Sequence, residues 1–443
     1  MTKRRGLQTA ALALAAVIVL HGFLGPDLAP RNLATLLVWV HIRGLLVLAL
    51  LAFGNVFCMA CPFTLVRDWT RRLTAPTRRW PRALRTKAPA VLLFVAVLFA
   101  YERWSLWSTP AGTAGLVLAY FAAAALTDSF FTGAPFCKWV CPLGQFNFAA
   151  SALSPFEVAA KDLAVCASCR TKDCLRGRRD ESGAVLLRGC ELGLFLPRKA
   201  ANMDCTFCMD CVAACPVENA GLVTRIPGAE LFTDGFRSGV GRPSSRLDLG
   251  ALSAVFMFGG LLNAFAMTGP AYAAADRLGG LPGLFLVGLG AAPLLLLAAA
   301  AAFSRRAAPA PLAATALRYA PSLIPLGTAV WTSHYLFHFL TGALTIVPAV
   351  QAAAVDLFGM EMLGRPLWGL AGIPPVSAQG VGQGLLLLGL LGSCLSARRL
   401  AQEAAPARPA AAAAPWFTLA ILLYAAAAWV MVQPMEMRGV FPS

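Results

Sequence analysis

Long apolar runs constrain the fold of this 443-residue chain more than any other feature. Nine of them reach or approach the roughly 18 residues that a helix needs to cross a membrane. Only 13% of the residues are charged and the mean hydropathy is +0.68, whereas a soluble domain carries about 25% charged residues. The sequence therefore predicts a mainly α-helical, polytopic membrane protein of about nine spans, at residues 7–24, 34–57, 89–107, 113–133, 249–268, 280–303, 320–347, 382–397 and 415–433.

A polar, cysteine-rich segment separates the fourth apolar run from the fifth. We therefore expect three parts: an N-terminal membrane domain of four spans at 1–136, an inserted module at 137–247, and a C-terminal membrane domain of about five spans at 248–443. The first apolar run follows basic residues, as in a signal peptide, but no small-residue cleavage site follows it. We expect it to be retained as the first span.

The distribution of lysine and arginine predicts the orientation of the chain. If the N-terminus lies inside, 17 of these residues fall in inner segments and 5, including Arg438, in outer ones, even without counting the insert. Because basic loops stay in the cytoplasm, we expect the insert to face the cytoplasm at a bacterial inner membrane. No nucleic-acid-binding motif accompanies the net charge of +16, so the expected partner is the lipid bilayer and no nucleic acid.

One run of cysteines carries the clearest chemical signal. It reads Cys205-Thr-Phe-Cys208-Met-Asp-Cys211-Val-Ala-Ala-Cys215-Pro216, which is the C-x2-C-x2-C-x3-C-P spacing of bacterial ferredoxins. Three thiolates two residues apart can wrap one [4Fe–4S] cubane, and the fourth points to a second cluster. Zinc sites instead pair one C-x2-C with a distant second one, so the spacing favours an iron–sulfur site.

A looser cysteine set precedes this run, and the two sets together supply the eight thiolates of two [4Fe–4S] clusters. Because the fourth cysteine of each motif usually binds the other cluster, we expect a crossed arrangement that forms a two-cluster, ferredoxin-like module. The alternative is local binding of one cluster by the four cysteines of the first set. The crossed arrangement assigns Cys166, Cys169, Cys174 and Cys215 to one cluster, and Cys190, Cys205, Cys208 and Cys211 to the other.

A third set of cysteines lies at predicted membrane boundaries. Cys58 and Cys61 end the second span, Cys137 and Cys141 follow the fourth, and a proline follows each pair. Both spans run inward, so the four thiols should meet at the cytoplasmic face. They could bind a third cluster, bind copper or iron, cycle as dithiols, or remain unligated. The reducing cytoplasm disfavours a disulfide.

The four histidines all fall in or beside predicted spans, toward the outer side. They are His21, His41, His334 and His338. The last two are four residues apart and share a helix face, so a bis-histidine haem b would need one of them with His41 or His21. A quinol pocket, a metal site, or plain hydrogen bonds between helices are the alternatives.

Arg43 follows His41 inside the second predicted span. A guanidinium at that depth needs a partner, and quinone oxygens, a haem propionate or a carboxylate such as Asp128 would serve; snorkelling to the interface is the other possibility. We therefore group Arg43 with the histidines as a possible haem or quinol site. Trp39 and Tyr335 are expected in interfacial aromatic belts.

On these cysteines the chain resembles the membrane polyferredoxins of the NapH/NosR type, which include CcoG-like proteins. Those proteins combine cysteine–proline motifs at membrane edges, commonly C-x3-C-P, with a cytoplasmic pair of [4Fe–4S] clusters. Cys137–Pro142 matches that motif, whereas Cys58–Pro62 has two intervening residues. The resemblance covers about residues 34–225. It implies electron transfer between the quinol pool and a respiratory partner, or assistance in assembling a copper enzyme.

The sequence thus predicts a membrane-bound iron–sulfur electron-transfer protein that links the quinol pool or a cytoplasmic donor to other respiratory electron-transfer proteins. It would be a quinol-oxidising subunit if the quinol is its own substrate. The alternative is a redox maturation factor for a copper-containing respiratory enzyme. No nucleotide-binding fingerprint and no Ser/His/Asp hydrolase arrangement is visible.

Overall fold

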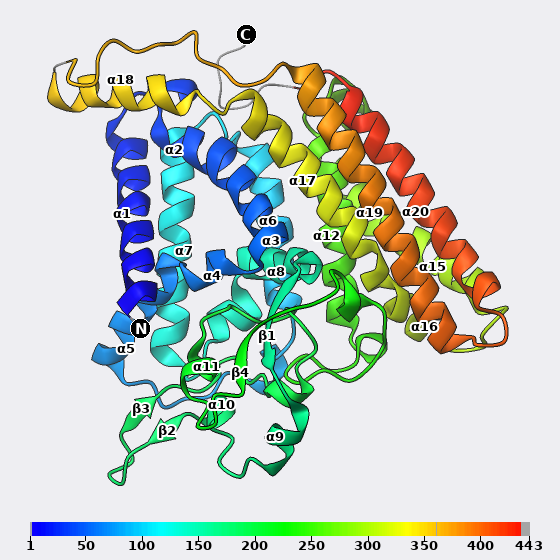
Figure 1. Ribbon diagram of the computed structural model, residues 1–443. Helices are drawn as coiled ribbons and strands as arrows, with labels where there is room; N and C mark the ends of the chain where they lie inside the picture. The colour runs from blue at the N-terminus through cyan, green and yellow to red at the C-terminus, as the bar shows by residue number, and fades with distance from the viewer. Residues whose placement is uncertain (1, 360, 436–443) are drawn as a thin grey trace.

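The computed structural model describes residues 2–359 and 361–435. The chain is mainly α-helical, with 68% of it in helices. Figure 1 shows the long helices side by side in one layer and the cysteine-rich insert packed against one end of that layer. Each apolar helix pairs its own backbone N–H and C=O groups, which a bilayer requires because it offers no water to them.

The N-terminal helices surround the first cysteine pair. Two of them join through a π-helical turn at Leu37–Ile42, which makes one continuous span at Leu33–Phe53. Prolines occupy the first turns of two others, where the missing N–H breaks no hydrogen bond. The helices are α1 (Thr2–Leu24), α2 (Leu33–Leu36), α3 (Arg43–Phe53), α4 (Val56–Met59), α5 (Pro62–Thr74), α6 (Ala88–Arg103) and α7 (Pro110–Phe130).

The C-terminal helices form a bundle around α17 (Ile324–Thr341). Every residue from Ile324 to His338 is buried, as expected for a helix that is apolar on all sides. It packs against the helices α19, α12 and α3. The other helices of this half are α12 (Leu247–Phe265), α13 (Gly269–Arg277), α14 (Leu281–Leu286), α15 (Ala292–Ser304), α16 (Leu312–Tyr319), α18 (Ile346–Phe358), α19 (Pro375–Ala404) and α20 (Pro409–Val432).

The number of spans is lower than the nine expected from the sequence. Among the described residues, seven helices are long and apolar enough to cross a membrane. The count is eight if residues 312–341 and 346–358, which are bent by 61°, form one span. The count of seven lacks predicted spans 89–107 and 320–347, and the count of eight lacks only 89–107, where α6 has only 16 residues. It ends at Arg103 because the chain turns there, with Ser105 in a left-handed conformation at φ 47°.

The apolar run at 382–397 was the shortest of the predicted spans, yet it forms the longest helix, α19, with 30 residues. Its flanks contain Gln379, Arg398 and Arg399, which an apolar window leaves out. Glutamine, arginine and alanine are nevertheless good helix formers, so the helix extends past the apolar part. Arg438, expected in an outer segment, lies outside the described residues.

The insert contains short elements joined by long loops. Strands β1 (Phe156–Ala160) and β4 (Ala220–Thr224) pair antiparallel, with Phe156 opposite Thr224. A second pair, β2 (Arg178–Arg179) and β3 (Val185–Leu187), forms a small hairpin. The helices of this region are α8 (Pro142–Ala150), α9 (Leu163–Ser168), α10 (Asp173–Arg176) and α11 (Asp210–Ala213). Helix α8 is buried along its length and contacts α3, α6, α12 and α17.

The N-terminal end of α1 lies against the insert. Arg4 donates hydrogen bonds to the Cys208 carbonyl and to the Asp210 carboxylate, both at 2.7 Å. The opposite end of the layer carries α18, which Figure 1 shows lying across the ends of α1 and α7. The start of the chain and the insert therefore lie on the same side of the helical layer.

Candidate metal centres

Twelve of the thirteen cysteines gather in three groups of four. The distal group lines one small cavity in the insert. The middle group lines a second cavity, and the membrane-edge group lines a third, where the insert meets the helical layer. The distal group is Cys166, Cys169, Cys174 and Cys215; the middle group is Cys190, Cys205, Cys208 and Cys211; the membrane-edge group is Cys58, Cys61, Cys137 and Cys141.

The distal group brings Cys215 next to the cysteines of the first motif. The Asn219 side chain donates a hydrogen bond to the Cys166 sulfur at 3.2 Å, and the Asn219 backbone N–H donates to the Cys215 sulfur at 3.3 Å. Backbone N–H donation from Lys172, with the Thr171 hydroxyl, lowers the pKa of half-buried Cys169. One asparagine thus bridges both cysteine motifs at the distal group.

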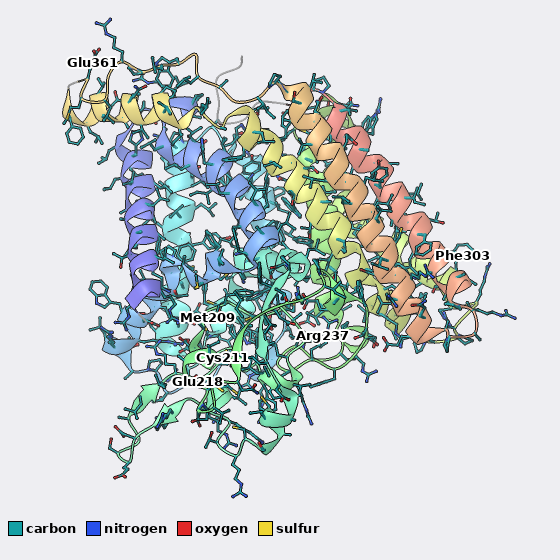
Figure 2. The ribbon with its side chains drawn as sticks, viewed as in Figure 1. Met209, Cys211, Glu218, Arg237, Phe303 and Glu361 are labelled. Atoms are coloured by element: carbon teal, nitrogen blue, oxygen red, sulfur yellow. The ribbon has the colours of Figure 1, made fainter. Side chains whose placement is uncertain are left out.

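The middle group lies in the apolar core of the insert. Figure 2 shows Cys211 in the part of the insert below the membrane helices. Burial raises the pKa of Cys208 to about 12, and burial followed by neighbouring thiols raises that of Cys211. These thiols are therefore neutral at pH 7 unless a metal displaces their protons.

The loop that carries the middle group has an unusual backbone. Asp204, Phe207 and Met209 all adopt left-handed conformations, with φ between 54° and 62°. Turns with alternating left-handed residues direct successive N–H groups into a concavity that suits an anion. The loop is held at its start by Lys87, whose buried ammonium contacts the buried Asp204 carboxylate. The local fold thus suits a cofactor that carries a net negative charge together with its cysteine thiolates.

The membrane-edge group is built from two cysteine–proline pairs at helix starts. Cys61 precedes Pro62 at the start of α5, and Cys141 precedes Pro142 at the start of α8. The Gly144 N–H donates to the Cys141 sulfur at 3.2 Å. Each cysteine therefore lies at the positive end of a helix dipole, which offsets part of the effect by which burial raises the pKa of both thiols. The different spacing of the two pairs does not prevent their sulfurs from sharing one cavity.

Cys61 and Cys141 of the membrane-edge group are buried, and Cys58 and Cys137 are half-buried. Burial raises the pKa of Cys58 to about 12 and that of Cys61 to about 11. The Asn147 side chain donates to the Cys58 sulfur at 3.4 Å. Thiolates at this group would thus need a bound metal to stay ionised.

The three groups lie next to one another. The Cys190 N–H of the middle group donates to the Cys174 carbonyl of the distal group at 3.0 Å. On the other side, the cavity of the middle group is also lined by Cys58 and Cys137. Asn55, three residues before Cys58, donates to the Cys205 carbonyl at 3.0 Å. The middle group therefore lies between the other two.

Cations surround the thiol groups. Arg4, Arg67 and Lys199 line the middle cavity, and Arg67 also lines the membrane-edge cavity. Arg67 forms ion pairs with Asp68 at 3.0 Å and with Glu191 at 3.1 Å. Burial lowers the pKa of Arg67, but Glu191 and other anionic neighbours outweigh burial and raise it. A permanent positive charge thus lies beside sulfurs that would be anionic if they bound a metal.

The donor sets suit a polynuclear cofactor. Each cavity offers at least four cysteines, and four are the ligand set of a [4Fe–4S] cluster. Among the residues that the structure describes, no three His, Cys, Asp or Glu side chains are arranged to hold a single metal ion. A cubane is a larger group than one ion, and its ligands stand farther apart.

The histidines are distributed over separate contacts. The Leu33 N–H donates to His21 Nδ1 at 3.2 Å, and His41 Nε2 lies 3.3 Å from the Ala343 carbonyl. His334 Nε2 lies 3.0 Å from the Met267 sulfur, and its ring centroid is 5.2 Å from that of His338. The structure brings His334 and His338 together, but it places His21 and His41 in other contacts.

Arg43 lies in an apolar cavity that no histidine lines. Its guanidinium carbon is 4.1 Å from the Trp39 ring centroid and 4.7 Å from those of Tyr101 and Tyr335. The expected partner Asp128 is instead 4.0 Å from Arg67. The fold turns Trp39 and Tyr335, which were expected in interfacial belts, toward Arg43.

Sequence reasoning missed the asparagines that donate to the cysteines, to a sulfur from Asn147 and Asn219 and to the Cys205 carbonyl from Asn55. Asn55, Asn147 and Asn219 each lie within six residues of a cysteine of the motifs. Their nearness to the motifs was the available signal, but an asparagine near a turn is more often a turn residue. Only the folded arrangement distinguishes the two roles.

Comparison with known proteins identifies one domain. A family model described as a 4Fe–4S binding domain matches residues 33–82 and 113–151. The match contains both cysteine–proline pairs and the helices that carry them. No curated protein and no solved structure matches the chain. The chain is thus a multi-pass membrane protein with a 4Fe–4S binding domain.

Proposed function

We propose that this protein is a membrane-bound iron–sulfur electron-transfer protein with three [4Fe–4S] clusters, one at each cysteine group. When bound, such a cluster accepts and donates one electron at a time. The distal and middle groups follow the crossed arrangement, in which Cys215 joins the first motif and Cys190 the second. The observation that carries the proposal is the adjacency of the three groups, which share the Cys190–Cys174 hydrogen bond and the cavity lined by Cys58 and Cys137.

The residues around the thiols support this role. Asn147 and Asn219 donate to sulfurs, and hydrogen bonds to ligating sulfurs set cluster potentials. The apolar core of the insert keeps water from the middle group, with Phe207 and Leu194 buried against its cysteines. Half-buried Cys169 leaves the distal group accessible from water. An electron could thus enter or leave at the accessible distal group and at the membrane edge.

The charge distribution supports a cytoplasmic insert at a bacterial inner membrane. Basic residues dominate the segments on the insert side. The membrane-edge group would exchange electrons with the quinone pool, and the distal group with another respiratory electron-transfer protein. The resemblance to membrane polyferredoxins of the NapH/NosR type agrees with this assignment.

Iron and acid-labile sulfide in the purified protein test the proposal. We expect about twelve irons per chain, three clusters of four. Cys174→Ala, Cys208→Ala and Cys141→Ala each remove one ligand from a different group, so each should lower the iron content to about eight. The matched control is Cys394→Ala, because Cys394 lies on α19, away from all three groups.

Two results would contradict the proposal. About eight irons in the unchanged protein would exclude a cluster at the membrane-edge group. The absence of labile sulfide would exclude clusters at all three groups. A deletion strain separates electron transfer from maturation of a copper-containing respiratory enzyme. Lost copper loading with intact quinol-linked electron flow would favour maturation.

A further inference from the structure

A second kind of cavity lies in the helical layer beside the membrane-edge group. It has a volume of about 200 Å³ and is enclosed by α3, α6, α7, α8 and α17. Its walls are almost entirely aliphatic and aromatic, and among the described residues Arg43 is the one charged residue that lines it. Arg43 lies ten residues into the span that starts at Leu33, which corresponds to about 15 Å at 1.5 Å per residue. The cavity thus contains a cation near the middle of the bilayer.

The Arg43 guanidinium is held by aromatic faces. Trp39, Tyr101 and Tyr335 surround it at 4.1 to 4.7 Å. Cation–π contacts offset part of the cost of a charge in hydrocarbon, but they leave the N–H donors of the guanidinium without an acceptor. Within residues 2–359 and 361–435, no carboxylate forms an ion pair with Arg43. The donors are available to a ligand in the cavity.

The local backbone is specialised at the same point. The π-helical turn Leu37–Ile42 ends immediately before Arg43. Such turns shift the helix register by one residue and occur frequently at functional sites. Here the shift sets the direction of Arg43 relative to Trp39, which lies inside the turn. The arrangement around the guanidinium is thus a property of this turn.

The cavity and the membrane-edge group share a wall. Phe57, Phe63 and Leu143 line both the apolar cavity and the cavity of the four cysteines. Tyr120 also lines the apolar cavity and stacks on Phe63 with the ring centroids 5.6 Å apart. A ligand beside these residues would be separated from the thiols by a single layer of side chains.

We propose that this cavity binds the head group of a quinone or quinol, with Arg43 as a hydrogen-bond donor to a ring oxygen. A flat, apolar ring suits aromatic walls, and its oxygens are the acceptors that the guanidinium needs. Haem fits less well, because no histidine, methionine or cysteine of the described part of the chain lines the cavity. The inference rests on the proposed function in one respect, namely that the bound ring would exchange electrons with the membrane-edge centre.

Equilibrium binding of a decyl-tailed benzoquinone to the full-length purified protein tests the inference. We expect saturable binding of one molecule per chain, weakened about tenfold or more by Arg43→Gln, because a charge-assisted hydrogen bond is lost. Val97→Phe should also abolish binding, since it fills the cavity without changing Arg43. The matched control is Arg31→Gln, which removes an arginine that pairs with Asp356 outside the cavity and should leave binding unchanged.

The iron content of each variant separates failure of this inference from failure of the proposed function. Two results with full iron content would overturn the inference alone. One is the lack of saturable quinone binding, and the other is binding by Arg43→Gln and Val97→Phe as tight as that of the unchanged protein. Displacement of the quinone by palmitate at a lower concentration than by unlabelled quinone would also overturn it, in favour of a fatty-acid site. A lack of iron in the unchanged protein contradicts the proposed function. The quinone site is then tested separately, by comparing quinone binding of the unchanged protein with that of Arg43→Gln and Val97→Phe.

Discussion

At the residue scale, Arg67 is the cation beside the thiols that faces three carboxylates. It is buried, and its guanidinium faces the carboxylates of Asp68, Asp128 and Glu191. Its positive charge also lies beside Cys137, whose sulfur would be anionic in a metal complex. The arginine therefore has a structural role that does not depend on any bound cofactor.

We expect Arg67→Met to destabilise the protein by about 3–5 kcal/mol, because it leaves buried carboxylates without a cation. SDS-induced unfolding of the purified protein would measure the change in the free energy of unfolding. Arg188→Met is the control, since Arg188 also pairs with Asp68 but its side chain is 35% exposed; its loss should cost below about 1 kcal/mol. Equal costs for the two variants would contradict this account of Arg67.

The residue scale also shows where sequence reasoning succeeds and where it stops. Cysteine spacing encodes local chain geometry, so the motifs could be grouped from the sequence. The structure places Cys215 in one cavity with Cys166 and Cys174, and their binding of one cluster stays a prediction. The surroundings of Arg43 could not be predicted, because Trp39, Tyr101 and Tyr335 come from three different helices. Long-range packing decides such a contact, and hydropathy contains no information about it.

At the element scale, the close crossing of α3 and α17 fixes the position of Arg43. A Cβ atom at Gly44 would overlap the Cβ and the ring of Phe339. Only glycine therefore lets α3 approach α17 this closely. The neighbouring Arg43 then reaches Tyr335 on the same helix as Phe339.

Gly44→Ala should destabilise the protein by about 1–3 kcal/mol, the usual cost of overpacking. It should also weaken quinone binding, because α3 must move away from α17. Gly115→Ala on α7 is the control: nothing lies within 4 Å of its Cβ, and alanine is the better helix former by about 0.5–1 kcal/mol. SDS-induced unfolding of both variants measures the contrast, and a Gly44→Ala protein as stable as the Gly115→Ala protein would contradict the crossing.

Helix existence could be predicted from the sequence, whereas helix ends could not. Apolar runs located the long helices, but α6 stops at Arg103 and α19 continues to Ala404. Both ends depend on turn conformation and helix propensity outside the apolar window. The π-helical turns at Leu37–Ile42 and Phe136–Val140 left no mark in the periodicity, although they carry His41 and Cys137.

At the scale of the whole molecule, the insert and the start of α1 lie on one side of the helical layer. If basic loops stay inside, this side is the cytoplasm. Alkaline phosphatase, which is active only outside, should therefore be active when fused after Gly369 and inactive when fused after Ala407. Activity in the reverse order would contradict the proposed orientation while leaving the cysteine groups unaffected.

The order of the three cysteine groups is the central claim about the molecule, because it makes one continuous path between water and membrane. Low-temperature EPR of the fully reduced protein tests it most directly, since neighbouring paramagnetic clusters broaden and split one another's signals. We predict an interacting spectrum in the unchanged protein. In Cys208→Ala, which removes the middle cluster, we predict two isolated, unsplit signals. Interaction that persists unchanged without the middle cluster would contradict the proposed order.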